Sequence, residues 1–357
     1  MTRHLLGACA AVAMLAACSS ESQPSSALTP ANPTASNAVK QRATVPSAAI
    51  RNAVARPNHA KSWVARDIAG APRLLFVADY GADDVQIFKM PSMELKGTLT
   101  GFDFPEGECT DKSGNIWITN TGAFQLLEYS RTGTLLNTLD DAYGYPSACA
   151  FDKNGNLAVA NIESATAGAG NIVVYANATG TGTVYTNSAL FLYFFVGYDP
   201  NGNLYFDGMD SSRTTSYFGE LPQGSSNTTL INLSGGTLHT AGFIQWYRNG
   251  NYLALGDQDC NGIPSACVYW VSVNRSTGTI TGTTNLASFE QYQVCDLVQG
   301  VIAANGERYL AGTDYEGPCG FSPTASNRWK WDAGGSPTNY NDTASFVEPI
   351  GAAISTK

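Results

Sequence analysis

The sequence predicts an all-β fold, a six-bladed β-propeller of four-stranded antiparallel blades, over residues 59–357. A turn of the form x-Gly-x recurs five times, and its glycines are 41, 47, 48 and 56 residues apart (Gly114, Gly155, Gly202, Gly250 and Gly306). Such spacings, with four strand-like segments per unit, are typical of propeller blades rather than helical solenoids. A low charged fraction of 14%, with 36 Gly and 17 Tyr, also favours strands joined by turns.

Each turn is followed by an alternating segment that we expect to be the second strand of its blade. A sixth matching segment, 75–79, lies before the first turn. The six second strands are predicted at 75–79, 116–120, 157–161, 204–207, 252–255 and 308–311. Third strands are expected at 85–88, 172–175 and 268–271, an outer strand at 278–284, and innermost strands just before the turns, as at 105–111 and 146–152.

The first unit has no innermost strand immediately before it, whereas the last unit is followed by a surplus segment, 348–354. We therefore expect these C-terminal residues to pair beside 75–79 and complete the first blade. This pairing closes the ring and removes the free sheet edges that promote aggregation.

The blade pattern is an innermost strand, an Asp-x-x-Gly-Asn turn and an alternating strand ending in Asn, clearest around Asp111 and Asp152. It resembles NHL-repeat propellers and the senescence-marker/gluconolactonase-type group over about 280 residues. The resemblance implies the propeller fold. It implies little about activity, because propellers carry out many chemistries.

The N-terminus reads as an export signal, with Arg3 and His4 followed by an apolar segment, 5–17, that is too short to span a bilayer. Residues 15–18, Leu-Ala-Ala-Cys, resemble a bacterial lipobox, which implies cleavage before Cys18 and a lipid anchor on its thiol. The alternative is cleavage near Ala17 and release of a soluble protein. With Ser19 after the cysteine, the resemblance implies a cell-envelope location, on the outer membrane if the cell has one and otherwise on the outer face of the cytoplasmic membrane.

Residues 18–58 are rich in Ser, Ala, Pro, Asn and Thr and have too few large apolar residues to fold, so we expect a disordered tether. Residues 19–73 carry a net charge of +5, whereas residues 74–357 carry 12 Lys+Arg and 27 Asp+Glu, a net charge of −15. The acidic domain is not expected to bind nucleic acid. The basic tether either rests on anionic lipid headgroups or simply keeps itself solvated.

Six cysteines remain beyond the signal, an even number that suggests disulfides in an exported chain. Cys109 and Cys149 lie two and three residues before equivalent turn aspartates, so their side chains face opposite sides of neighbouring innermost strands. We expect them to form a bond between blades, with two reduced core cysteines as the alternative. Cys260 and Cys267 would close a local loop, which leaves Cys295 and Cys319, both in the last blade.

Candidate ligand residues are those at the starts of innermost strands, where a propeller channel opens. These are Glu106, Ser147, His239, Asp296 and Glu348. By the gluconolactonase-type resemblance, Glu106 would hold a divalent cation such as Ca²⁺, with Glu348 in the neighbouring blade. That family also needs Asn and Asp where this chain has Ser147 and aromatic segments. No cofactor is therefore expected, and Ca²⁺ at Glu106 is the alternative to a solvated carboxylate.

His239 could act as a base at the channel mouth, although a lone histidine without an identifiable partner is more often a surface residue. The sequence holds no Gly-x-Ser-x-Gly elbow, phosphate loop or Cys/His pair, so no catalytic residue is assigned. Aromatic residues gather at 191–198 and recur in the last two blades, where they either pack between blades or bind sugars, quinones or peptides.

The function that we expect is a monomeric, lipid-anchored, non-enzymatic module that binds a protein, glycan or small molecule. The alternatives are a divalent-cation-dependent lactonase or lyase at the channel mouth and a purely structural envelope protein. Whether the chain is an enzyme stays open at this point.

Overall fold

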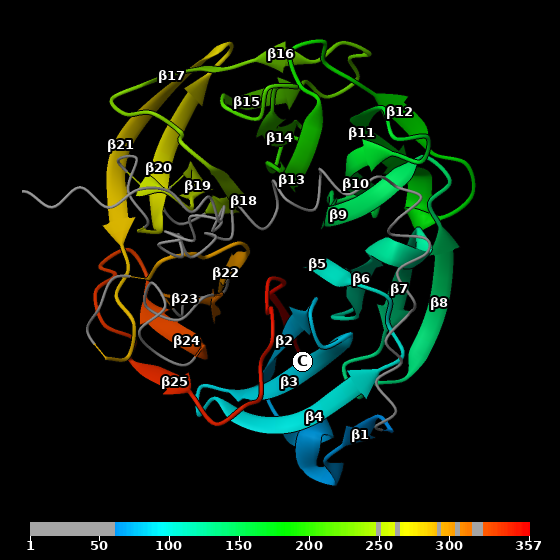
Figure 1. Ribbon diagram of the computed structural model, residues 1–357, viewed down its shortest axis with the longest axis vertical. Helices are drawn as coiled ribbons and strands as arrows, with labels where there is room; N and C mark the ends of the chain where they lie inside the picture. The colour runs from blue at the N-terminus through cyan, green and yellow to red at the C-terminus, as the bar shows by residue number, and fades with distance from the viewer. Residues whose placement is uncertain (1–60, 248–250, 261–264, 291–293, 304–307, 316–323) are drawn as a thin grey trace, which may run out of the picture. The chain divides into compact units, whose positions relative to one another are not determined.

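The computed structural model describes residues 61–247, 251–260, 265–290, 294–303, 308–315 and 324–357. These residues form six antiparallel sheets, and Figure 1 shows them as successive blades around a ring. We number the blades 1 to 6 in the order in which their second strands occur along the chain. The predicted six-bladed β-propeller is confirmed.

The innermost strands of blades 1 to 6 are β26 (Ala353–Thr356), β5 (Pro105–Thr110), β9 (Gly144–Phe151), β13 (Leu192–Tyr198), β18 (Ala241–Tyr247) and β22 (Gly300–Ile302). The second strands are β2 (Arg73–Asp79), β6 (Ile116–Asn120), β10 (Leu157–Ser164), β14 (Leu204–Met209), β19 (Tyr252–Asp257) and β23 (Tyr309–Asp314). All six predicted second strands are therefore present, with ends within a few residues of the predicted ones.

The third strands are β3 (Asp84–Met90), β7 (Gln125–Tyr129), β11 (Ala169–Tyr175), β15 (Ser216–Leu221), β20 (Cys267–Asn274) and β24 (Ala325–Lys330). The fourth strands are β4 (Glu94–Thr100), β8 (Leu135–Asp140), β12 (Thr183–Tyr185), β16 (Thr229–Leu230), β21 (Thr277–Asn285) and β25 (Asn339–Asn341). A fifth strand is added to blade 1, β1 (Trp63–Val64), and to blade 5, β17 (Asn232–Ser234). The described residues also form three short 3-10 helices: η1 (Arg66–Gly70), η2 (Thr121–Ala123) and η3 (Ala176–Ala178).

The turn between the first two strands of blades 2, 3 and 4 is built by its aspartate. In blade 2, Asp111 Oδ1 accepts the backbone N–H groups of Ser113 at 2.8 Å and Asn115 at 2.9 Å. Gly114 has φ = +81°, a left-handed conformation that glycine adopts without steric cost. Asp152 and Asp199 make the equivalent contacts in blades 3 and 4. The predicted turns at Gly250 and Gly306 lie outside the described residues.

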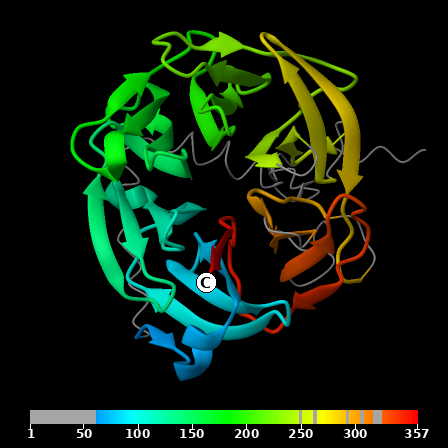
Figure 2. The ribbon, with the colours of Figure 1, turned by 180° about the vertical axis from the view of Figure 1, so that it is seen from behind.

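The ring closes at blade 1, where β26 pairs with β2 in antiparallel register, Leu75 opposite Ile354 and Phe76 opposite Ala353. A further bridge joins Asp79 to Pro349. The view from behind shows the same closure, with the red C-terminal strand beside the blue start of the domain (Figure 2). The C-terminal segment thus supplies the innermost strand of the first blade, as predicted.

Apolar side chains fill the spaces between blades. Blades 2 and 3 pack through Trp117 and Leu126 against Val159 and Val173, all of them buried. The same interface contains the disulfide Cys109–Cys149, whose predicted pairing is confirmed. Blades 1 and 6 pack through a cluster that includes Leu75, Val77, Phe88, Tyr309, Ala311 and Ile354.

The second predicted disulfide, Cys260–Cys267, is also present and lies in blade 5. Cys295 is disulfide-bonded as well. Cys319 lies outside the described residues, so its pairing stays a prediction.

The predicted signal peptide, 1–17, and tether, 18–58, with Cys18, lie outside the described residues. Among the described helices, all of them short, none is long and apolar enough to cross a membrane.

Candidate functional site

A space on the ring axis lies where the innermost strands end, and we call it the central cavity. Its volume is about 390 Å³, and its wall includes residues from all six blades. Pockets of this size commonly hold small molecules. Polar and apolar surface contribute about equally to the wall, and its polar residues include Arg73, Glu108, Gln245 and Gln299.

The innermost strands pair with a neighbour on one side only, so their other edge presents backbone N–H and C=O groups toward the axis. Two glutamines in the cavity wall bind some of these groups. Gln245 of blade 5 donates to the carbonyl of Ile302 at 2.8 Å and accepts its N–H at 2.7 Å. Gln299 makes the same paired contact with the backbone of Glu108, at 2.7 and 2.9 Å. These side chains fix the spacing of blades around the cavity.

Glu108 also brings a buried carboxyl group to the cavity wall. The residue is 2% exposed, and neither carboxyl oxygen has a hydrogen-bond partner within the usual distance among the described residues. Burial raises its pKa well above the ordinary value, and the nearby N–H of Ala353 opposes this only in part. The neutral acid is therefore favoured, which makes the wall less charged than its sequence indicates.

Two of the five predicted site residues, Glu106 and Ser147, lie together at the opposite end of the channel. They line a small pocket of about 10 Å³ with Phe194, Val298 and Ile350, which has room for about one water molecule. The Ser147 hydroxyl lies 2.9 Å from the Phe194 carbonyl and 3.0 Å from the Ala160 carbonyl. It therefore ties blade 3 to blade 4.

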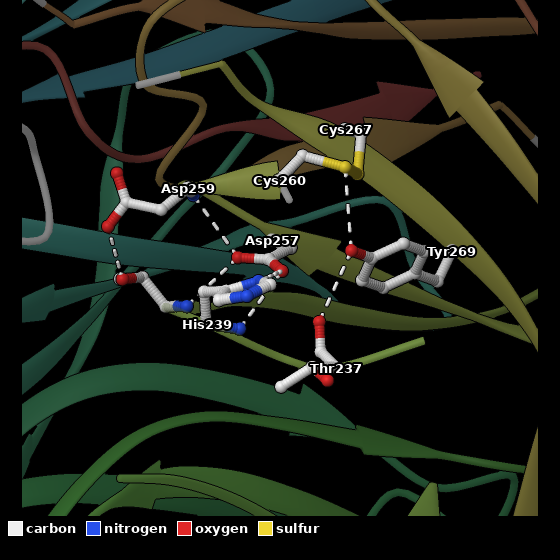
Figure 3. Close-up of a disulfide and its surroundings, with 8 residues drawn as sticks. Thr237, His239, Asp257, Asp259, Cys260, Cys267 and Tyr269 are labelled. Atoms are coloured by element: carbon white, nitrogen blue, oxygen red, sulfur yellow. Dashed lines mark hydrogen bonds and ion pairs between the residues drawn. A yellow bond between two sulfur atoms is a disulfide. The ribbon is translucent and has the colours of Figure 1, made fainter. Parts of the chain in front are cut away.

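His239 has a partner that the sequence did not reveal. Its Nδ1 lies 3.4 Å from Oδ2 of Asp257, a fully buried carboxylate at the end of β19 (Figure 3). The same carboxylate accepts the backbone N–H groups of His239 at 3.0 Å and Thr240 at 2.9 Å. The adjoining disulfide Cys260–Cys267 holds the chain that follows Asp257 (Figure 3).

This use of Asp257 is one case of a repeated arrangement. In blade 1, Asp79 accepts the N–H groups of Val347 at 2.8 Å and Glu348 at 2.7 Å, and in blade 4 Asp207 accepts that of Phe195 at 2.9 Å. An aspartate near the end of the second strand thus holds either the innermost strand or the segment that leads to it. The His239–Asp257 contact therefore has a structural role, like the equivalent contacts in blades 1 and 4.

The remaining predicted residues are placed differently. Asp296 is fully buried just before β22, and Glu348 lies in the segment that leads to β26. Neither these two nor His239 is among the residues that line the central cavity or the small pocket. Within the described residues, no group of three or more His, Cys, Asp and Glu side chains could hold a metal ion.

We predicted the site at the starts of the innermost strands, whereas the larger of the two axial spaces lies at their ends. Gln245 and Gln299 were not foreseen, because one glutamine in an apolar strand carries no motif. The signal that was available is the terminal aromatic residue of an innermost strand, such as Tyr198 or Trp246.

Comparisons with known proteins agree with this architecture. No protein-family model matches the sequence, and no curated protein matches it. A chain from the crystal structure of a nidogen/laminin complex is similar, with a TM-score of 0.57, 12% identity, and coverage of 79% of this chain and 98% of that one. A protein of unknown function from Bacteroides caccae has a TM-score of 0.59 and 16% identity, covering 80% of this chain and 100% of that one.

TolB from Acinetobacter baumannii is similar as well, with a TM-score of 0.56 and 14% identity over 82% of this chain and 68% of that one. At these identities the likeness extends to the fold alone. Fold and topology together define the chain as a six-bladed β-propeller protein.

Proposed function

We propose that this protein is an exported, lipid-anchored β-propeller that acts as a non-enzymatic binding module, with its ligand in the central cavity. The observation that carries the proposal is the cavity of about 390 Å³ walled by all six blades. Cross-links between blades, such as Gln299 to Glu108 and Cys109 to Cys149, preorganise this wall. A preorganised wall lowers the entropy cost of binding.

The lining indicates the class of ligand. Alanine, valine and isoleucine side chains alternate with strand edges that offer amide donors and acceptors. A compact molecule that carries both apolar groups and amide or carbonyl groups satisfies both features. A narrow peptide segment of a partner protein has the same chemistry, and one of the structural neighbours comes from a protein complex.

The anchor in this proposal is Cys18, and the location is the cell envelope. The lipobox-like residues before Cys18 support it, as does the net positive charge of residues 19–73 beside an acidic domain. Replacement of Cys18 by Ser should move the protein from the membrane fraction to the soluble fraction of an expressing bacterium, and continued membrane retention would contradict the anchor.

The binding proposal is tested by filling the cavity. Ligand-observed NMR with a panel of amide-bearing fragments identifies binders of the unaltered protein. Ala150→Trp and Val301→Trp place an indole at the cavity wall and should weaken fragment binding at least tenfold. Leu136→Trp, on the exposed outer strand β8, adds the same group away from the cavity and should leave binding unchanged. Equal binding by all three variants would overturn the proposal.

The second candidate is a divalent-cation-dependent lactonase or lyase centred on Glu106, favoured by the burial of Glu106 beside Ser147 at one end of the channel. A cation bound only to the folded state raises its unfolding midpoint. The binding module predicts equal midpoints in calcium and in chelator. An unfolding midpoint that is higher in calcium than in chelator would favour the cation-dependent enzyme over the binding module. This increase should be lost in Glu106→Gln and kept in Glu94→Gln, at an exposed position.

A further inference from the structure

A second space, separate from the ring axis, opens between blades 4 and 5, and we call it the blade-4/5 cleft. Its volume is about 540 Å³. One wall is the Asp199–Asn203 turn of blade 4, and the other is the hairpin between β20 and β21, which includes Arg275 and Ser276. The lining also includes Tyr205, Glu220 and Trp246.

Trp246 lines both the blade-4/5 cleft and the central cavity. It is only partly buried, and within the described part of the chain its indole N–H has no hydrogen bond and its ring no aromatic neighbour. Trp270, the other partly buried tryptophan of blade 5, makes structural contacts instead. Trp270 donates to Thr284 Oγ1 at 2.9 Å and stacks on Tyr252 with ring centroids 5.4 Å apart. Trp246 is thus an aromatic surface with its polar group still available.

The polar groups around Trp246 are held in fixed positions. Asp199 accepts the N–H groups of Asn201 and Asn203, at 2.8 and 2.9 Å, which sets the shape of one wall. Tyr205 lies opposite Glu220, its cross-strand partner on β15. Burial, helped by the charge of Asp199, raises the pKa of Glu220. The cleft therefore offers rigid oxygen acceptors close to an apolar ring.

At the rim, Arg275 is exposed and makes no ion pair with any described residue. Its backbone has φ = +55°, so the tight hairpin turn determines where its side chain leaves the chain. The guanidinium adds donors to a site whose other charged residues are carboxylates. The cleft has two acidic residues, Asp199 and Glu220, and one basic residue, Arg275, so an anionic ligand is disfavoured.

We propose that the blade-4/5 cleft binds a neutral oligosaccharide, with one sugar ring stacked on Trp246. A pyranose ring presents C–H groups on its faces and hydroxyl groups around its rim. The electron-rich indole face attracts the polarised C–H groups, and carboxylates, amides and the guanidinium bind the hydroxyls. This site is distinct from the central cavity and does not depend on what the cavity binds.

The test is a calorimetric titration of the purified protein with cellotetraose and with chitotetraose. Tetragalacturonate, of similar size but anionic, is the comparison ligand. We expect saturable binding of at least one neutral tetrasaccharide and at least tenfold weaker binding of the anionic one. Trp246→Ala should abolish the binding, whereas Trp270→Phe should keep it.

Two further variants separate this site from the central cavity and guard against misfolding. Arg275→Ala and Glu220→Gln alter residues that line only the cleft and should weaken oligosaccharide binding about five- to tenfold. Ala150→Trp, which fills the cavity, should leave it unchanged. Failure of both neutral tetrasaccharides to bind, binding that all cleft variants retain, or Trp246-dependent binding of a cationic peptide instead would overturn the glycan proposal.

Discussion

The side-chain amide of Gln299 in blade 6 binds the backbone of Glu108 in blade 2, with Oε1 2.9 Å from the Glu108 nitrogen and Nε2 2.7 Å from its carbonyl oxygen. The two residues are 191 positions apart in the chain. Oε1 also accepts the N–H of Ala352 in blade 1 at 3.0 Å. One side chain therefore joins three blades at the wall of the central cavity.

Replacement of Gln299 by Leu should destabilise the domain. The variant leaves two N–H groups and one carbonyl at the cavity wall without these partners, and an unsatisfied buried polar group costs about 1–3 kcal/mol. We expect a loss of about 2–4 kcal/mol in the free energy of unfolding, measured by urea denaturation. Gln223→Leu, at an exposed position, is the control. Equal stability of the two variants would show that water replaces the amide at no cost.

Stability should fall as the pH rises from about 4 to 8. Burial, with the charges of Asp79 and Asp83, raises the pKa of Asp84 to about 7, and burial raises the pKa values of Glu108 and Asp207 well above normal. The folded state therefore holds protons that the unfolded chain releases near pH 4. Under that condition the free energy of unfolding decreases with pH until the buried groups ionise.

Asp84→Asn isolates this effect, because asparagine resembles the protonated acid. At pH 8 the variant should be more stable than the unaltered protein by about 2–4 kcal/mol, and the difference should vanish near pH 4. Urea denaturation at pH 4.5, 6 and 8 measures the trend. Asp342→Asn, at an exposed position, should show no such trend. A difference that does not change with pH would contradict the raised pKa of Asp84.

The fold could be predicted from the sequence because its signals are local and repeated. A short sequence pattern predicts each of three features. These are the turn built by Asp111, the strand Ile116–Asn120 after it, and the C-terminal segment that completes blade 1. The site could not be predicted to the same degree. Gln299 meets Glu108, and His239 meets Asp257, only after the blades have folded, and no periodicity links such partners.

The two described disulfides should differ in what they contribute to stability. Cys109–Cys149 spans 40 residues, whereas Cys260–Cys267 spans seven. In the chain-entropy model, closing these loops restricts the unfolded state by about 4 and about 2 kcal/mol, respectively. Double alanine variants of each pair, compared by urea denaturation, should differ in this order. All four cysteines are at least nine-tenths buried, so the cavity cost is similar in both variants. A reversed order would indicate that the loop around Cys260 contributes more than entropy.

A chain that ends at Ser345 should lose its cooperative fold. It lacks β26, the N–H groups of Val347 and Glu348 that Asp79 accepts, and Ser355, whose hydroxyl donates to the Gly114 carbonyl at 2.5 Å. The edge of β2 is then free to pair with another molecule. Light scattering should detect oligomers, and urea denaturation should show a broadened transition. A chain that ends at Thr356 keeps β26 and is the control.

A stricter test supplies the missing innermost strand of blade 1 as a separate peptide. If the truncated chain fails only because blade 1 lacks its innermost strand, a synthetic peptide of residues 346–357 should pair with β2 in the register Leu75 opposite Ile354 and restore the particle size of the full chain. A peptide with Ile354→Asp should fail, because Ile354 packs in the cluster between blades 1 and 6. A truncated chain that keeps the particle size and the unfolding midpoint of the full chain would show that the other five blades hold the ring without β26.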